Sequence, residues 1–237
     1  MNYNNTVGQT VDTSAVSKTF VSNVFSWMAI ALGITAIFAY YFGTNAAFIS
    51  SLIDETGVKP LGWVVTFAPL AFVLVMSFAF NKLSASALTL LFIAYSFVMG
   101  MSLSFIFLIY TASSIYLTFG VTAATFGAMA LLGYTTKTDL SKFGAILGMA
   151  LVGLIIAMLV NFFMKSSTMD YVISIFGVLI FTGLTAWDVQ KIKMIGANAE
   201  QGTEPGRKLA LMGALTLYLD FINLFLFLLR FLGNRND

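Results

Sequence analysis

The chain has 237 residues, of which 59% are apolar and only 9% are charged, and its formal net charge is +2. A soluble domain carries roughly 25% charged residues, so this composition excludes an ordinary water-soluble globule and predicts a protein embedded in a bilayer. The small net charge, without any block of Lys and Arg, argues against nucleic-acid binding. Cysteine and histidine are absent, which excludes disulfides, thiol nucleophiles, His-based triads and the usual zinc sites. We therefore expect neither an enzyme nor a resident cofactor.

Seven segments of the sequence approach or exceed the roughly 20 apolar residues that a helix needs to cross a bilayer. In chain order they are Phe20–Phe42, Leu61–Phe80, Ala87–Tyr110, Ile115–Tyr134, Phe143–Met164, Tyr171–Ile195 and Lys208–Leu232. Residues 1–19 form a polar tail that lacks the features of a signal peptide. Residues 20–232 form one transmembrane domain, and residues 233–237 form a short C-terminal tail. The sequence thus predicts an all-α polytopic membrane protein with seven transmembrane helices.

Basic residues are distributed unevenly between the two sides of this predicted bundle. Eight fall on the side of the N-terminal tail, and four fall on the other side. The eight are Lys18, Lys82, Lys137, Lys142, Lys191, Lys193, Arg207 and Lys208, and the four are Lys59, Lys165, Arg230 and Arg235. Because cytoplasmic loops carry the excess of Lys and Arg, we expect the N-terminus in the cytoplasm and the C-terminus outside.

Two acidic residues, Asp188 and Asp220, lie within the sixth and seventh spans, where lipid-embedded helices normally carry no charge. A charge at the centre of such a helix costs about 2.5–3.5 kcal/mol on insertion scales, so these residues are rarely without a function. At about 1.5 Å per residue, Asp188 lies about 10 Å in from Ile195 and Asp220 about 18 Å in from Lys208. Helix tilt allows the two aspartates to share one depth. Because the two spans are antiparallel neighbours, a facing pair of carboxyl groups is predicted.

Such a pair cannot ionise fully at low cost and is expected to share one proton, which makes it a candidate pH sensor and a candidate cation ligand. Asp220 lies on a helical stripe of small and polar residues that should face protein or water. The stripe comprises Gly213, Thr216, Asp220, Asn223, Phe227 and Arg230. Lys191 is one turn from Asp188 and either pairs with it or only determines topology. The alternative is that each aspartate merely binds a Thr, Tyr or Asn and locks the helices together.

Three segments resemble signatures of the Bax inhibitor-1 (transmembrane Bax inhibitor motif) family. They are Leu217–Phe225 followed by Leu228–Arg230, Ala186–Lys193, and Gly133–Ser141. The resemblance runs from about Lys18 to the end and is closest to the bacterial YccA-like branch. It implies a seven-helix bundle whose last helix is central and wrapped by the other six, located in a bacterial inner membrane.

For function, the resemblance implies a pH-sensitive Ca²⁺ leak governed by Asp188 and Asp220, with Ca²⁺ or H⁺ as the permeant ion. Eukaryotic relatives restrain cell death, and some bacterial ones bind a membrane-bound AAA protease. The alternative is therefore a membrane-embedded regulator that binds other membrane proteins, such as that protease or cell-death factors, without conducting ions. Apart from these, the only partner expected is the lipid bilayer.

One position departs from the family pattern. In some bacterial relatives a basic residue at the end of the second span is thought to pair with the aspartates. The matching position here is the neutral Asn81, followed by Lys82. Asn81 can donate a hydrogen bond but supplies no charge. Lys82 would reach the pair only by bending back around the helix. We expect a looser closed state, in which Asn81→Arg lowers the leak and Lys82→Ala changes it little.

Overall fold

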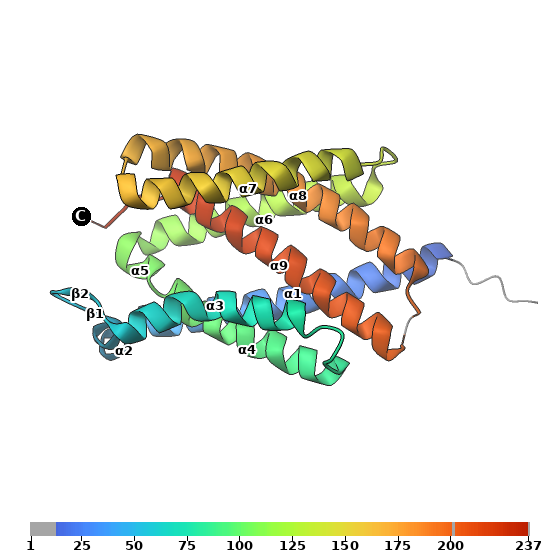
Figure 1. Ribbon diagram of the computed structural model, residues 1–237, viewed down its shortest axis with the longest axis horizontal. Coiled ribbons are helices and arrows are strands. Elements are labelled where there is room, and N and C mark those ends of the chain that lie inside the picture. Colours follow the sequence, from blue (N-terminus) through green and yellow to red (C-terminus); the bar gives the residue numbers. More distant parts are fainter. Residues whose placement is uncertain (1–12, 201, 237) are drawn as a thin grey trace, which may run out of the picture.

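The computed structural model describes residues 13–200 and 202–236, and this part of the chain is almost entirely helical (Figure 1). Its helices are α1 (Thr13–Gly43), α2 (Ala46–Leu52), α3 (Pro60–Phe78), α4 (Ala85–Leu103), α5 (Ile106–Ile109), α6 (Ala112–Thr135), α7 (Ser141–Met164), α8 (Ser167–Asn198) and α9 (Glu204–Leu232). Within it, seven helical segments are long and apolar enough to span a membrane, with α4 and α5 taken together. The prediction of an all-α protein with seven transmembrane helices is confirmed.

Several helices begin at a polar side chain that caps the free backbone N–H groups of the first turn. Ser84, Thr111 and Ser166 each accept a hydrogen bond from the backbone N–H three residues further on. Thr203 caps α9 in the same way, and α9 has a proline in its first turn. These caps satisfy donors that would otherwise lack partners. They place the starts of α4, α6, α8 and α9 within short polar turns at the two ends of the bundle.

The ends of the helices differ from those predicted. α1 already begins at Thr13, seven residues before the apolar segment that starts at Phe20. α8 starts at Ser167 instead of Tyr171 and ends at Asn198 instead of Ile195. The third span is interrupted after Leu103, between α4 and α5. Hydropathy marks only the stretch that suits hydrocarbon, whereas a helix continues until a cap or turn ends it.

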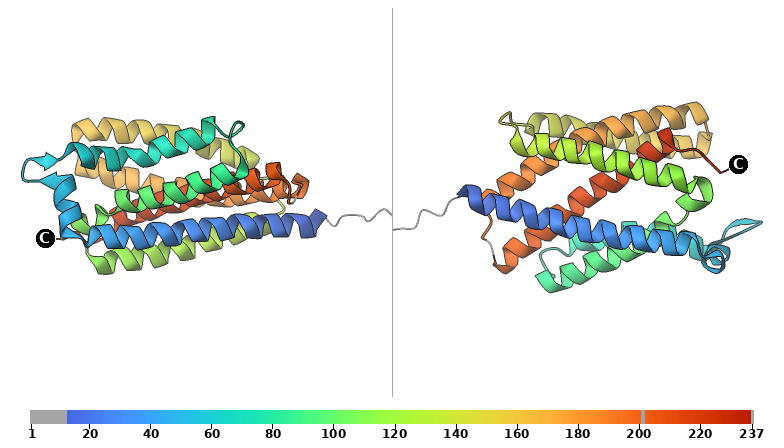
Figure 2. Two further views of the ribbon diagram at one scale, coloured as in Figure 1. Left: turned by 90° about the horizontal axis from the view of Figure 1, so that it is seen from below. Right: turned by 180° about the vertical axis from the view of Figure 1, so that it is seen from behind.

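The last helix, α9, occupies the centre of the bundle and crosses the other helices diagonally (Figures 1 and 2). It packs mainly against α1, α4, α6 and α8. The two remaining spans pack elsewhere, because α3 lies mainly on α4 and α7 lies mainly on α8. The central position predicted for α9 is therefore confirmed, and four of the other six spans supply its main contacts. α8 and α9 are the most buried spans, with 61% and 67% of their apolar windows buried, whereas the value for α7 is only 17%.

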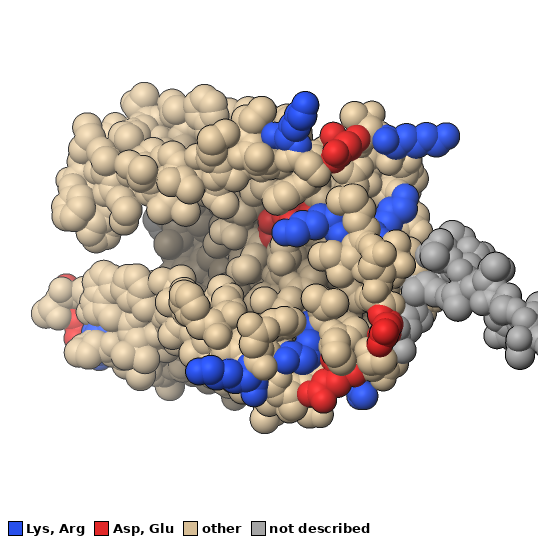
Figure 3. All heavy atoms as spheres, turned by 45° about the vertical axis from the view of Figure 1, so that its right-hand side comes forward, with Lys and Arg blue, Asp and Glu red and all other residues tan. Residues whose placement is uncertain are grey.

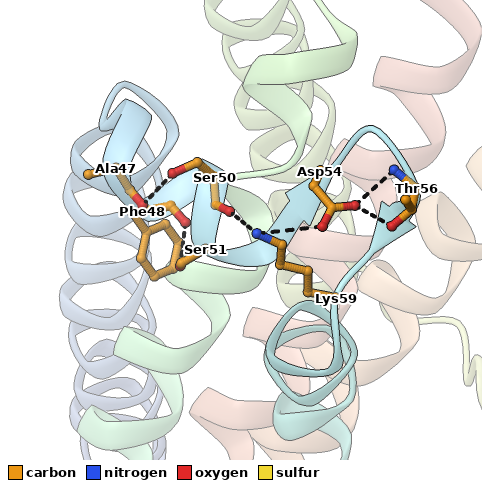
Figure 4. Close-up of polar contacts among 7 residues, drawn as sticks. All are labelled: Ala47, Phe48, Ser50, Ser51, Asp54, Thr56 and Lys59. Carbon is orange, nitrogen blue, oxygen red and sulfur yellow. Dashed lines mark hydrogen bonds and ion pairs between the residues drawn. The ribbon is translucent and has the colours of Figure 1, made fainter.

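Residues between α2 and α3 form a two-stranded hairpin of β1 (Ile53–Asp54) and β2 (Gly57–Val58). Gly57 has φ +123°, a conformation that only glycine adopts readily. The Asp54 carboxylate accepts hydrogen bonds from the hydroxyl and the backbone N–H of Thr56, at 2.5 and 2.8 Å (Figure 4). These bonds lower the pKa of Asp54 below its ordinary value. Lys59 bridges to the other Asp54 oxygen at 3.6 Å and donates to the Ser50 carbonyl at 2.7 Å (Figure 4).

The surface of the bundle is mainly apolar along its length, and most of the charged side chains visible in Figure 3 gather toward one end of the bundle. Large side chains such as Phe78, Phe163 and Leu117 are 83%, 81% and 71% exposed. Exposed apolar area on this scale is incompatible with a water-facing surface and fits contact with lipid. The same view shows a hollow between the two groups of helices at the opposite end (Figure 3).

Candidate functional site

Three consecutive residues of α8 each contact a different neighbouring helix. Successive helical residues point about 100° apart, so Ala186, Trp187 and Asp188 face α6, α7 and α9 in turn. A Cβ atom added at Gly133 of α6 would overlap the Ala186 carbonyl oxygen, and one added at Gly144 of α7 would overlap the Trp187 ring. Both glycines therefore permit a close approach that no other residue would allow. These two contacts fix α8 immediately beside Asp188.

Asp188 and Asp220 face each other across the α8–α9 interface, with their carboxyl groups in close contact. Both residues are buried, with exposed fractions of 6% and 5%. Two carboxylates have no proton to donate, so a hydrogen bond between them requires that one of the two groups is protonated. The Oδ2 atom of Asp220 is buried without a hydrogen-bond partner in the described part of the chain. The site thus combines two buried carboxyl groups, which are in contact, with a buried oxygen that has no hydrogen-bond partner among the described residues.

A second polar cluster lies on the opposite side of α9. Tyr218 precedes Asp220 by two residues and so points about 200° away from it. Its hydroxyl lies 2.7 Å from the Thr35 hydroxyl of α1, which donates to the Ser96 carbonyl of α4 at 2.9 Å. The Tyr95 ring packs edge-on against Tyr218 at 5.4 Å, and the Tyr95 hydroxyl is buried without a partner among the described residues. These bonds connect α9 to α1 and α4, while the aspartates connect it to α8.

The residues predicted to support the pair are mostly occupied elsewhere. The Asn223 amide donates to the Leu219 carbonyl at 2.8 Å, and the Thr216 hydroxyl donates to the Met212 carbonyl at 3.0 Å, so both are satisfied within α9. Arg230 forms an ion pair with Asp170 at 3.2 Å, and this pair joins the end of α9 to the start of α8. It lies ten residues, or about 15 Å along the helix axis, from Asp220. Arg230 is therefore not part of the aspartate site.

Lys191 is the one predicted cation close enough to act on Asp188. Its charge interacts with the Asp188 carboxyl group, but its ammonium nitrogen lies 5.0 Å from the centroid of the Trp187 ring. Within the described residues, Lys191 forms no ion pair of 4 Å or less with Asp188. Trp187 therefore holds Lys191 over its ring, where the cation–π interaction competes with a direct ion pair.

Asn81 and Lys82 do not lie on a helix, because α3 ends at Phe78 and the chain then turns. The prediction that Lys82 is placed one helical step after Asn81 is therefore wrong. Both residues are exposed. Asn81 lines a surface cavity with Glu204 and Lys208 of α9, near the tail end of the bundle. In this conformation neither residue is bonded to the aspartates.

The segment after α6 is held by Gln190, which follows Asp188 by two residues. The Gln190 side chain accepts a hydrogen bond from the Leu140 N–H and donates one to the Thr138 carbonyl, both at 2.8 Å. Lys193 donates to the Tyr134 carbonyl at 2.7 Å. Hydrogen bonds from the side chain and backbone of Ser141 lower the pKa of Asp139 in the same loop. The positioning roles of Gln190 and Gly133 were missed, although both residues fall within the motifs quoted above.

Comparison with known proteins identifies the family. A family model described as inhibitor of apoptosis-promoting Bax1 matches residues 17–237. The inner membrane protein YbhL of Escherichia coli is 48% identical over 92% of this chain and 92% of its own length. Uncharacterized proteins of Borreliella burgdorferi and Rickettsia prowazekii are 46% and 43% identical, over 94% and 97% of this chain and 94% and 98% of their own lengths. The chain is thus an integral membrane protein that belongs to the Bax inhibitor-1 family, as its motifs predicted.

Proposed function

We propose that this protein provides a pH-sensitive leak path for cations, with Ca²⁺ as the permeant ion, and that Asp188 and Asp220 form its gate. The observation that carries the proposal is the contact between two buried carboxyl groups at the interface of the two most buried spans. Intramembrane acids of this kind are costly to keep and commonly mark ion pathways or proton relays. A pair that shares a proton also supplies a switch in a chain without histidine.

The physical basis of the switch is repulsion between like charges. With one proton present, the bond between Asp188 and Asp220 holds α8 against α9. When both groups ionise, two unit charges 4 Å apart repel by about 4 kcal/mol at an effective dielectric constant of 20. That energy changes an equilibrium nearly a thousandfold, since about 1.4 kcal/mol corresponds to a factor of ten. Loss of the shared proton is therefore sufficient to favour separation of the helices or entry of a cation between the carboxylates.

The conformation described here is closed. Asp188 and Asp220 are 6% and 5% exposed, so an ion cannot reach them without movement of the surrounding helices. Two carboxyl groups also supply fewer oxygens than the six to eight that bind Ca²⁺ stably. Within the described residues, no cluster of three or more acidic side chains that could hold a metal ion occurs. We therefore assign Ca²⁺ the role of a passing ion that the pair contacts transiently, and not that of a bound cofactor.

We place the protein in a bacterial inner membrane with its N-terminus in the cytoplasm. The printed name of its Escherichia coli relative, an inner membrane protein, supports the location. The excess of Lys and Arg on the side of the tail supports the orientation. On that arrangement the Asn81–Lys82 turn faces the cytoplasm, and the hairpin faces outside.

The proposal is tested by reconstituting the purified chain alone into liposomes and measuring Ca²⁺ entry with an internal indicator between pH 5 and pH 8. We expect flux above that of protein-free liposomes, with a pH dependence that Asp188→Asn and Asp220→Asn each change. Asp170→Asn is the matched control, because Asp170 lies on α8 as well but pairs with Arg230. An absence of flux at every pH would refute a leak path. That result would favour the alternative of a regulator that binds other membrane proteins and uses the aspartate pair as a latch.

A further inference from the structure

A second charged site lies at the end of the bundle where the α7–α8 turn meets the end of α9 (Figure 1). A cavity of about 360 Å³ occurs there. Its charged lining consists of Lys165, Asp170 and Arg230, and its apolar lining consists of Met158, Phe162 and Ile173. Since Arg230 is about 15 Å from Asp220 along α9, this site is separate from the aspartate pair.

The cavity carries an excess of positive charge. Arg230 uses one guanidinium nitrogen to bind Asp170 at 3.2 Å. A guanidinium group has five N–H donors, so most of the donors of Arg230 stay free for another acceptor. The Lys165 ammonium group forms no ion pair with any described carboxylate. Two cations against one anion leave a net charge of +1, which favours a ligand with a single negative charge.

The turn that carries Lys165 is held by its own hydrogen bonds. Lys165 ends α7 in the left-handed conformation, with φ +52°. The buried Asn161 side chain accepts a hydrogen bond from the Ser166 N–H at 3.0 Å, and the Asn161 carbonyl accepts one from the Lys165 N–H at 2.7 Å. The Ser166 hydroxyl then caps α8 by accepting from the Met169 N–H. These bonds fix the backbone at Lys165, which lines the same cavity as Arg230, so little backbone entropy is lost on binding.

The apolar part of the cavity is continuous with the surface that contacts lipid. Phe162 is 66% exposed, and its neighbours Phe163 and Met164 are 81% and 63% exposed. Ile173 of α8 is buried and forms part of the floor. A ligand that fits this lining has an anionic group at the end of the bundle and a hydrocarbon chain that runs along α7. A free inorganic anion would leave the apolar part of the cavity without a partner.

We propose that this cavity binds one anionic phospholipid, with its phosphate between Lys165 and Arg230 and an acyl chain against Phe162 and Met158. Asp170 orients the Arg230 guanidinium group and limits the net positive charge. This phospholipid site does not depend on ion passage, because neither Asp188 nor Asp220 lines the cavity.

The test is a native mass spectrometry titration of the purified full chain in detergent with dioctanoyl phosphatidylglycerol. We expect Lys165→Gln and Arg230→Gln to weaken binding by a factor on the order of ten, as loss of a hydrogen bond to a charged group does. Asp170→Asn should strengthen binding, since it removes the competing carboxylate. Lys59→Gln is the matched control: Lys59 also lies beside an aspartate at this end of the bundle, at 3.6 Å, but outside this cavity (Figure 4).

Two further ligands show how much of the affinity comes from the acyl chains and how much from the phosphate group. Dioctanoylglycerol has the same chains without the phosphate and should bind more weakly, and inorganic phosphate at equal concentration should not displace the lipid. The proposal is overturned if Lys165→Gln binds the lipid as the wild type does, or if Lys59→Gln weakens binding equally. Displacement of the lipid by equimolar phosphate would also overturn it, because the site would then recognise a free anion. Lys165→Gln and Asp170→Asn decide the question even if Arg230→Gln fails to fold.

Discussion

Substitution of Gly133 by alanine should separate α6 from α8 beside the aspartate site. The added Cβ atom would overlap the Ala186 carbonyl oxygen and lie 2.8 Å from both the carbonyl carbon and the Cα atom of Ala186. All three atoms belong to the backbone of α8, so no side chain can rotate away to make space. Overpacking of this kind costs about 1–3 kcal/mol. The higher helix propensity of alanine returns at most about 1 kcal/mol.

We therefore expect Gly133→Ala to lower the free energy of unfolding by about 2 kcal/mol, taking the upper end of the overpacking cost because backbone atoms are involved. For a chain of this length, that corresponds to a fall of about 4–8 °C in melting temperature. Gly127→Ala is the matched control, because Gly127 lies on α6 as well and has no atom within 4 Å of its added Cβ. The assay is thermal unfolding of both variants in one detergent. Equal stability of the two variants, or a Gly133→Ala variant as stable as the wild type, would show that the α6–α8 contact is not tight.

Three further predictions concern the rest of the bundle. Thr35→Val should destabilise the protein by about 1–3 kcal/mol, because it leaves the buried Tyr218 hydroxyl unpaired. In unfolding measurements, the double variant Thr35→Val with Tyr218→Phe should lose less stability than the sum of the two single variants. The pKa of Asp139 is lowered by hydrogen bonds at the start of α7. The Asp139 carboxylate therefore contributes to folding stability above the ordinary pKa of 3.8, and this contribution is lost as pH falls through the lowered pKa. Asp139→Asn should thus reduce stability at neutral pH but not at a pH below both pKa values. A cysteine at Lys137 should react only with reagent that reaches the cytoplasm, and one at Thr56 only from outside; the same accessibility for both would contradict the three spans that separate them.

The sequence predicted the spans well because lipid is a uniform solvent, and a run of about 20 apolar residues is a strong signal. It predicted the ends of the helices poorly, since these depend on caps and turns in the polar boundary; α1, for example, begins seven residues before Phe20. The facing of Asp188 and Asp220 could be predicted because the two are the interior acids of neighbouring antiparallel spans. The number of helices around α9 could not, because it depends on which apolar faces pack together, and hydropathy is similar on all of them.

The glycine contacts were also beyond prediction from one sequence. Gly133 and Gly144 matter because of Ala186 and Trp187, residues that lie more than 40 positions away in the chain. Nothing in the local pattern distinguishes them from Gly127 and Gly148, which face open space. Arg230 was predicted to support the aspartate pair, because helical spacing places it on the same stripe as Asp220. It lies too far from Asp220 along the helix axis to do so. Periodicity reports the face of a helix, whereas a site also requires a common depth.

The central claim is that Asp188 and Asp220 act as one proton-sharing unit that controls cation passage. The most direct measurement is the pH profile of Ca²⁺ flux in liposomes for the wild type, Asp188→Asn, Asp220→Asn and the double variant. If the pair is one unit, each single change removes the shared proton site, and the double variant should resemble either single variant instead of showing the sum of their effects. Single variants with the wild-type pH profile, or a double variant whose effects simply add, would contradict the account.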